Sequence, residues 1–378
     1  PEGKSVVVGQ RVKVSFGQGN KRIDGFVVRV SESAPEGVKN LKEISSAYPE
    51  VYFDEKKVEF IEEMRKKYLA TYLDIIKLII PRGVLSGMKY KTSERLYVVK
   101  DATEKYKDEK YLAILDLIRT NQGQFIKSDM VKQGFSLSSV NTLIKHGFIA
   151  VMSENEYRYN IEEYESYAPK VLNKEQVDAL AEINGAKGTF LLHGITGSGK
   201  TEIFLDLIRQ NIEEGKDSIV LLPEISLTPQ MIERFKGRFG RDITIFHSRL
   251  SDGERYDEWH RVKNGKVKIA IGARSALFLP FKNLKLVIID EEHESTYKSD
   301  MNPKYNAKEV AEMMMEENGG RVVLASATPS VESFHRAETG DIKLISLKER
   351  ATKGTLPEMD IVDMRDELMS GNRSIFSR

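Results

Sequence analysis

The sequence predicts a chain of several domains that ends in an α/β unit built on a parallel sheet. At 378 residues the chain exceeds the roughly 100–200 residues of a typical domain. Its pattern also changes twice, from alternating valines, through short amphipathic helices, to apolar runs that alternate with helix-like segments. We therefore expect a small β-rich domain over residues 1–83, a winged helix over 84–168, an α/β domain over 169–355 and a linker over 356–378.

The first unit begins with the pattern of two strands. Residues 1–30 alternate valines with polar residues and break at Gly17 to Asn20, as two strands joined by a glycine-containing turn would. The stretch holds six basic residues against Glu2 and Asp24. Two interpretations of this charge stay open, a solvated hairpin face and a sheet that contacts phosphates. The basic residues are Lys4, Arg11, Lys13, Lys21, Arg22 and Arg29.

A helical pattern closes the first unit. Apolar residues recur at helical spacing from Phe53 to Ile80, and the sequence Pro81-Arg82-Gly83 then stops the pattern. We expect one long helix that is broken once. Its most apolar part is far shorter than the roughly 20 residues that cross a bilayer, so we expect no membrane partner.

The second unit has the pattern of a winged helix, which is three helices followed by a hairpin. The third helix, capped by Ser136 or Ser138, is expected to end at Gly147, and the alternating stretch "FIAVMSENEYRYN" behind it predicts the hairpin. In winged helices the third helix and the wing commonly meet DNA, which points to Lys145 and Arg158. A winged helix that serves only as a packing module stays an open alternative.

Six apolar runs mark the third unit. Each is followed by a helix-like or polar segment, and strands that are buried on both faces and alternate with helices are typical of a parallel sheet. The runs are "TFLLH", "SIVLLP", "ITIFH", "VKIAIGA", "LKLVIID" and "RVVLASA".

A glycine-rich turn lies between the first of these runs and a helix-like stretch. Its sequence, "GITGSGKT", satisfies the pattern G-x-x-x-x-G-K-[ST] in the expected place between a strand and a helix. The glycines let backbone N–H groups converge on a phosphate, while Lys200 reaches the β and γ oxygens and Thr201 offers a hydroxyl to Mg²⁺. The sequence therefore predicts ATP and Mg²⁺ as cofactors. The predicted binding residues are Gly194, Thr196, Gly197, Ser198, Gly199, Lys200 and Thr201.

An acidic box follows the apolar run "LKLVIID". Asp290 ends this predicted strand, so that it lies at the same sheet edge as the glycine-rich turn and completes the Mg²⁺ ligands. Glu291 polarises the attacking water as a general base. Lys200, Asp290, Glu291 and His293 are the predicted catalytic residues.

The sequence Asp290-Glu291-Glu292-His293 resembles the D-E-x-H box of superfamily 2 helicases and translocases, and further motifs of that family follow in order. The resemblance implies a RecA-like motor lobe. It assigns adenine recognition to Gln176, a nucleic-acid phosphate contact to Thr228, and coupling or strand contacts to Arg274, Ser326 and Thr328.

A narrower resemblance is to the bacterial replication-restart DNA helicases of the PriA family. It rests on "LLPEISLTPQ", "FHSRLSDGERYDEWHRVKNG", "GARSALFLPF" and "DEEHESTYK". The resemblance implies 3′→5′ unwinding of stalled forks, with forked and single-stranded DNA, primosome proteins and single-strand-binding proteins as partners in the bacterial cytoplasm and nucleoid. It also implies that the first unit binds a 3′ DNA end through residues such as Lys13, Lys21 and Arg22. An aromatic-rich loop containing Tyr297, Lys298 and Tyr305 would then stack on single-stranded DNA.

The chain departs from the family's full pattern. It stops at Arg378, and the resemblance then implies that the second motor lobe, its arginine finger and a cysteine-rich zinc region lie outside it. Zinc is expected for the full-length family, but the chain has no cysteine to hold it. An initial strand of the first domain is also expected to be missing. We therefore expect a fragment that binds nucleotide and forks but unwinds little by itself.

Other functions stay open at this level. A non-catalytic module that marks forked DNA, or another superfamily 2 motor acting on RNA or DNA, would carry the same glycine-rich turn or basic units. A P-loop kinase fits less well, because it needs neither the D-E-x-H box nor the "SAT" segment.

Overall fold

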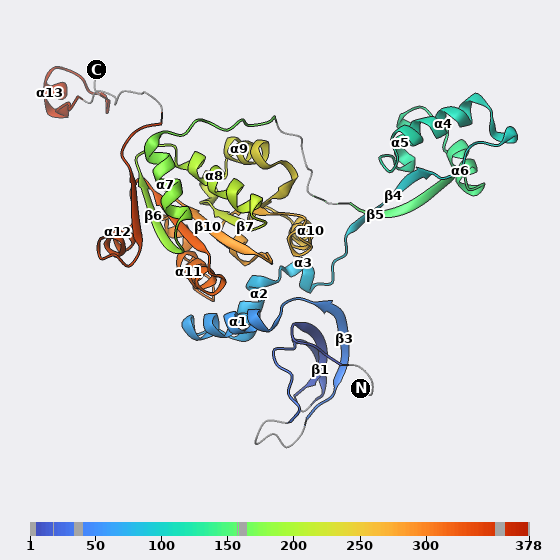
Figure 1. Cartoon of the computed structure of the whole chain (residues 1–378), viewed down its shortest axis with the longest axis horizontal. Helices are drawn as coiled ribbons and strands as arrows, with labels where there is room; N and C mark the ends of the chain where they lie inside the picture. The colour runs from blue at the N-terminus through green and yellow to red at the C-terminus, as the bar shows by residue number, and fades with distance from the viewer. Residues whose placement is uncertain are drawn as a thin grey trace.

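The computed structural model describes residues 5–17, 19–33, 41–156, 158, 165–351 and 360–376. Figure 1 shows a large α/β unit, a smaller N-terminal unit packed against it, and a helical unit held away from both at the end of a two-stranded ribbon. This arrangement follows the order of patterns along the sequence.

The N-terminal unit contains a three-stranded antiparallel sheet in the order β2-β1-β3. The hairpin of β1 (Gln10–Phe16) and β2 (Lys21–Phe26) confirms the expected pair of strands, with Gly17 at a φ of 70° in the turn. The expectation missed β3 (Ile44–Val51), which contains Pro49. Because β3 lies at an edge of the sheet, this proline is tolerated there.

The helical part of this unit is broken once, as expected. α1 (Glu55–Lys67) is followed by α2 (Tyr72–Ile79) and the short α3 (Arg82–Leu85). The break lies before α2, where Thr71 and Asp74 form a reciprocal capping box. This cap stabilises a new helix start and separates α2 from α1.

The N-terminal unit shares a hydrophobic core with the α/β unit. Trp259, on α10 (Asp252–Lys263), is fully buried, and its Nε1 donates a hydrogen bond of 2.9 Å to the carbonyl oxygen of Ile79. The Lys263 ammonium donates 2.7 Å hydrogen bonds to a carboxylate oxygen of Glu50 and to the carbonyl oxygen of Val51. These contacts fix the N-terminal unit on one face of the α/β unit.

The helical unit has its own core and the three helices of the expected winged helix. The Ser136 side chain caps the third helix by accepting from the Ser139 N–H at 3.2 Å. The expected hairpin behind this helix is wrong: β5 (Ile149–Glu156) is a single strand that pairs antiparallel with β4 (Lys91–Val98), which precedes the helices. The alternation of apolar and polar residues identified the strand, but it does not indicate which strand, distant in sequence, pairs with it. The helices are α4 (Glu109–Thr120), α5 (Lys127–Lys132) and α6 (Leu137–Lys145), with a 3₁₀ turn η1 (Glu104–Tyr106) before them.

Arg158 corrects the expectation of a DNA contact from the wing. Its guanidinium and backbone N–H each donate to the fully buried carboxylate of Asp257 on α10, both at 2.8 Å. The guanidinium also donates to the carbonyl oxygen of Lys89, just before β4, at 2.8 Å. Arg158 therefore ties the base of the β4–β5 ribbon to the α/β unit.

The α/β unit is a seven-stranded, fully parallel sheet in the order β12-β6-β11-β10-β7-β9-β8. The six predicted runs all form strands. The seventh strand, β12, was missed because it lies at the edge, where its residues are only partly buried. The strands are β6 (Gly188–Gly194), β7 (Asp217–Leu221), β8 (Ile243–Phe246), β9 (Ile269–Gly272), β10 (Leu284–Asp290), β11 (Arg321–Ser326) and β12 (Lys343–Leu347).

Helices cover both faces of this sheet, and each face has a continuous core. One face holds α7 (Lys174–Asn184), α8 (Lys200–Glu213) and α9 (Pro229–Phe239); the other holds α10 and α11 (Ala307–Asn318), with α1 and α2 packed outside them. None of the described helices is long and apolar enough to cross a membrane. The remaining elements are α12 (Val331–Glu338), α13 (Met364–Met369), and the 3₁₀ turns η2 (Glu224–Ser226), η3 (Gly240–Asp242), η4 (Arg274–Phe278) and η5 (Ser295–Tyr297).

The Arg158–Asp257 contact predicts a defined pattern of stability. Replacing Arg158 by Ala leaves the buried Asp257 carboxylate without its cation, which should lower the free energy of unfolding by about 3 kcal/mol. The double variant R158A/D257A should recover most of this loss, because no unpaired buried charge remains. Urea unfolding followed by circular dichroism measures both variants. An R158A protein as stable as the parent would contradict this account.

Candidate nucleotide and magnesium site

A glycine turn connects β6 to α8 at the carboxyl edge of the sheet. Gly197 and Gly199 have φ angles of 82° and 83°, a left-handed conformation that side chains other than glycine rarely adopt. A Cβ atom on Gly199 would also lie 2.2 Å from Nε2 of Gln176. Glycine at this position therefore satisfies both the backbone conformation and the close approach of α7.

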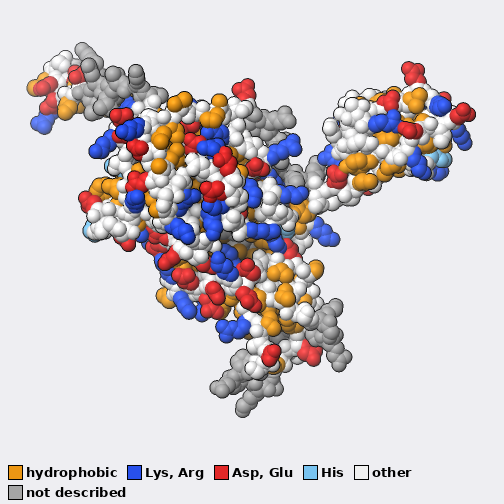
Figure 2. All heavy atoms as spheres, viewed as in Figure 1, with side chains coloured by type: hydrophobic (Ala, Val, Ile, Leu, Met, Phe, Trp, Pro, Cys, Tyr) orange, Lys and Arg blue, Asp and Glu red, His pale blue; other side chains and the backbone are white. Residues whose placement is uncertain are grey.

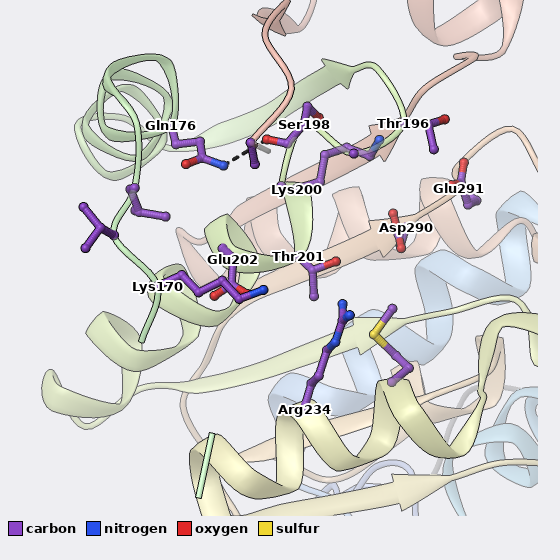
Figure 3. Close-up of a pocket in the computed structure, with 16 residues that line it drawn as sticks. Lys170, Gln176, Thr196, Ser198, Lys200, Thr201, Glu202, Arg234, Asp290 and Glu291 are labelled. Atoms are coloured by element: carbon purple, nitrogen blue, oxygen red, sulfur yellow. Dashed lines mark hydrogen bonds and ion pairs between the residues drawn. The ribbon is translucent and has the colours of Figure 1, made fainter. Parts of the chain in front are cut away.

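This turn forms one wall of a cleft of about 460 Å³. Figure 3 shows Lys200, Thr201 and Asp290 around it, with Gln176 and Lys170 toward one end and Arg234 below Thr201. The cleft thus brings the predicted phosphate and metal residues together with two further cationic side chains, Lys170 and Arg234. Its lining residues are Lys170, Val171, Leu172, Gln176, Thr196, Gly197, Ser198, Gly199, Lys200, Thr201, Glu202, Met231, Arg234, Asp290, Glu291 and Ala351.

The Lys200 ammonium donates a 2.7 Å hydrogen bond to the carbonyl oxygen of Gly194, within its own turn. A charged phosphate oxygen is a stronger acceptor than this neutral carbonyl. The Oγ of Ser198 is buried without a hydrogen-bond partner in the described part of the chain. Both groups are therefore available to an anion that enters the turn.

Gln176 is buried and its amide is largely engaged. Its Oε1 accepts from the Asn173 N–H and its Nε2 donates to the carbonyl oxygen of Ser198, each at 2.9 Å. The amide therefore holds the glycine turn against the start of α7. One Nε2 hydrogen remains, so the role of Gln176 in reading adenine stays a prediction.

Asp290 ends β10 as a buried carboxylate facing the cleft. Burial, followed by the adjacent charge of Glu291, raises the pKa of Asp290 to about 6. Its Oδ1 has no hydrogen-bond partner among the residues that the structure describes. An orphaned buried carboxylate oxygen is costly unless a cation binds it.

Thr201 and Asp290 suit a magnesium ion. A hydroxyl and a carboxylate oxygen are hard ligands, and Mg²⁺ commonly uses one or two protein groups together with phosphates and water. The described residues contain no cluster of three or more His, Asp or Glu side chains that could hold a metal without such help. The orphaned Asp290 oxygen beside Thr201 therefore fits Mg²⁺ bound with a nucleotide.

The remaining residues of the acidic box meet the "SAT" segment after β11. Nδ1 of His293 lies 2.8 Å from Oγ of Ser326, which accepts from the Thr328 N–H at 3.0 Å. Ser326 Oγ also lies 3.5 Å from a carboxylate oxygen of Glu291. Glu291 has a φ of 46°, an uncommon conformation for glutamate. The predicted base and the predicted coupling residues are thus in direct contact.

Glu292 is a structural residue that the sequence patterns did not single out. It is fully buried, which alone would raise its pKa, but the hydrogen bond from Lys308 at 2.6 Å and those from Ser330 and Ser333 lower it. This carboxylate holds the acidic box to α11 and to the start of α12. The only sign of this residue in the sequence is its place at position "x" of the D-E-x-H box.

The structure corrects the expectation that Tyr297 and Tyr305 stack on bases. Both rings are buried, at 2% and 3% exposure. The Tyr297 hydroxyl donates to the carbonyl oxygens of Asp290 and Leu221, and the Tyr305 ring packs edge-on against a phenylalanine of η4. Neither ring offers a face to a base, because both are used within the core.

Arg274 and Lys298 lie at the same loop. Arg274 donates to the carbonyl oxygens of Thr296 and Lys298, the first at 3.0 Å, and so fixes the backbone of this loop beside the acidic box. The Lys298 side chain is exposed. Their roles in contacting or sensing DNA stay predictions.

The other predicted DNA contacts are not among the residues that line the cleft. Thr228 caps α9, with its hydroxyl accepting from the Met231 N–H at 3.3 Å. The exposed Lys13, Lys21 and Arg22 lie on the β1–β2 hairpin, and Lys145 is exposed at the end of α6. The structure places all of these on the surface or at a helix start, and their contacts with DNA remain predictions.

Comparison with known proteins matches two families to this chain. A family described as "DEAD/DEAH box helicase" matches residues 173–337, and one described as "3'DNA-binding domain (3'BD)" matches residues 1–81. The replication restart protein PriA of Bacillus subtilis is 48% identical over 65% of this chain. The chain belongs to the PriA family. Proteins of the same name in Synechocystis and Chlamydia pneumoniae are 35% and 32% identical over 83% and 96% of the chain.

The match covers only part of each PriA relative. The aligned segments span 31% of the Bacillus subtilis protein, 38% of the Synechocystis protein and 50% of the Chlamydia pneumoniae protein. The chain therefore corresponds to about half, or less, of the PriA proteins that it matches. It includes the 3'DNA-binding domain and the helicase domain that carries the cleft.

The raised pKa of Asp290 predicts how stability depends on pH. Since the folded-state pKa of about 6 lies above the ordinary value of 3.8, the folded protein binds a proton that the unfolded chain has released. Without metal, the stability should therefore rise as pH falls through 6, and the ionised carboxylate should destabilise the fold above it. Asp290→Asn should add about 2–3 kcal/mol at pH 8 and little at pH 4.

Urea unfolding in a buffer with chelator measures this difference. Asp300→Asn, at an exposed carboxylate after the same strand, is the matched control and should have no such pH dependence. An equal effect of Asp290→Asn at pH 4 and pH 8 would refute the assignment of a destabilising buried charge.

Proposed function

We propose that this chain is the fork-binding and ATP-binding part of a 3′→5′ DNA helicase that recognises stalled replication forks and initiates primosome assembly. The observation that carries the proposal is the convergence of Lys200, Asp290 and the Glu291–His293–Ser326 contacts at one edge of the sheet. The match to PriA proteins supports the DNA substrate and the replication-restart setting.

The proposed chemistry follows from the cleft. Lys200 and the backbone N–H groups of the glycine turn bind the β and γ phosphates, and Thr201 with Asp290 holds Mg²⁺. When bound, Mg²⁺ neutralises charge that develops on the phosphate oxygens. Glu291 orients and deprotonates the attacking water. His293 connects this base to Ser326 and so to the segment proposed to follow strand movement.

The proposed DNA contacts divide between two units. The first unit binds a 3′ DNA end through exposed basic residues of its hairpin, Lys13, Lys21 and Arg22, and the winged helix adds Lys145. The proposed boundaries are residue 83 between the first unit and the winged helix, residue 168 between the winged helix and the motor lobe, and residue 355 between the motor lobe and the linker. Primosome and single-strand-binding proteins are the proposed protein partners, in the bacterial cytoplasm and nucleoid.

The first test separates nucleotide binding from fork binding. Lys200→Ala removes a charge-assisted contact and should raise the Kd for Mg·ATP by about 10- to 100-fold. The Kd for a forked DNA with a free 3′ leading-strand end should stay unchanged, since the basic hairpin is distant from the cleft. Lys266→Ala, an exposed lysine at the opposite edge of the sheet, is the control and should change neither value. If Lys200→Ala bound ATP with unaltered affinity, the nucleotide would have to bind outside this cleft.

Steady-state ATP turnover with and without the fork tests the proposed division of labour. The resemblance assigns the arginine that stabilises the transferred phosphoryl group to a second lobe, so we expect fork binding with little turnover. Strong stimulation of turnover by the fork would show that these residues suffice for hydrolysis and would overturn that expectation.

A further inference from the structure

Two cationic side chains in the nucleotide cleft, Lys170 and Arg234, lie outside every motif that the sequence suggested. Arg234, on α9, lines the cleft and is exposed. Figure 3 shows its guanidinium directed toward Thr201, whereas Gln176 lies toward the other end of the cleft. It makes no hydrogen bond or ion pair with the described residues. What this arginine binds is therefore an open structural question.

The packing of α9 on α8 explains why Arg234 lies there. Arg238, one turn further along α9, is 3.6 Å from a carboxylate oxygen of Asp206 on α8. α8 follows β6 and α9 follows β7 on the same face of the parallel sheet, so both helices run in the same general direction. One turn back from Asp206 lies Glu202, and one turn back from Arg238 lies Arg234. The neighbouring Phe235 is fully buried and fixes the rotation of α9. Arg234 is thus held beside the first turn of α8.

The carboxylate that this alignment would offer to Arg234 is already engaged. Oε1 of Glu202 accepts from the Tyr167 hydroxyl at 2.8 Å and lies 3.7 Å from the Lys170 ammonium. Glu202 is therefore directed to the segment before α7. Arg234 and Lys200 are left as cations on two sides of Thr201, where a polyanion would satisfy both.

We propose that Arg234 contacts the phosphate chain of the bound nucleotide and is a second phosphate-binding cation of this site, supplied from α9. This inference rests on the proposed function, because it deepens the assignment of the same cleft to ATP. The guanidinium donates to phosphate oxygens from the side opposite the glycine turn. Arg234 thereby adds affinity for the triphosphate and not for the base.

The test uses the full chain and two probes, a fluorescent ATP analogue and inorganic tripolyphosphate, which has the phosphate chain without a base. Arg234→Ala and the neutral Arg234→Gln should each raise the Kd of both probes by about tenfold or more, and by the same factor. Arg234→Lys, which keeps the charge, should recover part of the loss. Arg241→Ala, an exposed arginine just after α9, should bind both probes as the parent does.

Three outcomes would overturn the inference. Unchanged affinity of Arg234→Ala and Arg234→Gln for both probes would show that Arg234 does not touch the ligand. A loss for the ATP analogue without a loss for tripolyphosphate would assign the contact to base or ribose. A lowered urea midpoint in both variants, with parental affinity in the fraction that stays folded, would make the role structural.

The same measurements separate this inference from the proposed function. If Lys200→Ala loses binding and the Arg234 variants do not, the proposed function stands and this inference fails. If the parent chain binds neither probe, both fail.

Discussion

The parallel pairing of β6, β11 and β10 is the constraint on which the rest of this structure depends. Ala325 on β11 lies opposite both Asp290 on β10 and Leu192 on β6. The carboxyl ends of the three strands therefore share one edge, and the glycine turn, the acidic box and the "SAT" segment meet there although they lie far apart in the chain. Helices on both faces bury these strands, and that burial gives the carboxylate of Asp290 its raised pKa.

Three unfavourable features of the α/β unit lie at this edge. Within the described ranges, Asp290 has a buried oxygen and Ser198 a buried hydroxyl without a hydrogen-bond partner, and Glu291 has a left-handed backbone. Each costs free energy in the protein alone, and each is of a kind that clusters at functional sites. The buried Glu292 with its bonds to Lys308, Ser330 and Ser333 holds the strained turn in place. The hydrogen-bonded network around Glu292 thus supports the neighbouring groups that lack hydrogen-bond partners among the described residues.

The two N-terminal units are attached to the α/β unit by different kinds of contact. The first unit shares an apolar core with it through Trp259 and is further fixed where the Tyr68 hydroxyl donates to Glu309 on α11 at 2.9 Å. The same helix carries Lys308, which binds Glu292, so α11 touches both the first unit and the acidic box. The winged helix instead stands off on the β4–β5 ribbon, held at its base by Arg158 and Asp257 (Figure 1). Figure 2 shows acidic and basic side chains intermixed on the visible face of the α/β unit, in keeping with the net charge of +1.

The sequence by itself determined the features that depend on local pattern. Six buried strands, the hairpin, the broken helix, the glycine turn and the acidic box follow from periodicity, turn residues and the close coupling of each motif to its own strand. Only the tertiary structure decided which side chains face one another. It buried Tyr297 and Tyr305, to which the family resemblance had assigned stacking on single-stranded DNA, and it turned Arg158 from the wing to a carboxylate on α10. It also placed Arg234 in the cleft by packing α9 on α8 and made Glu292 a structural anchor. These outcomes depend on contacts between segments distant in sequence, which no local pattern encodes.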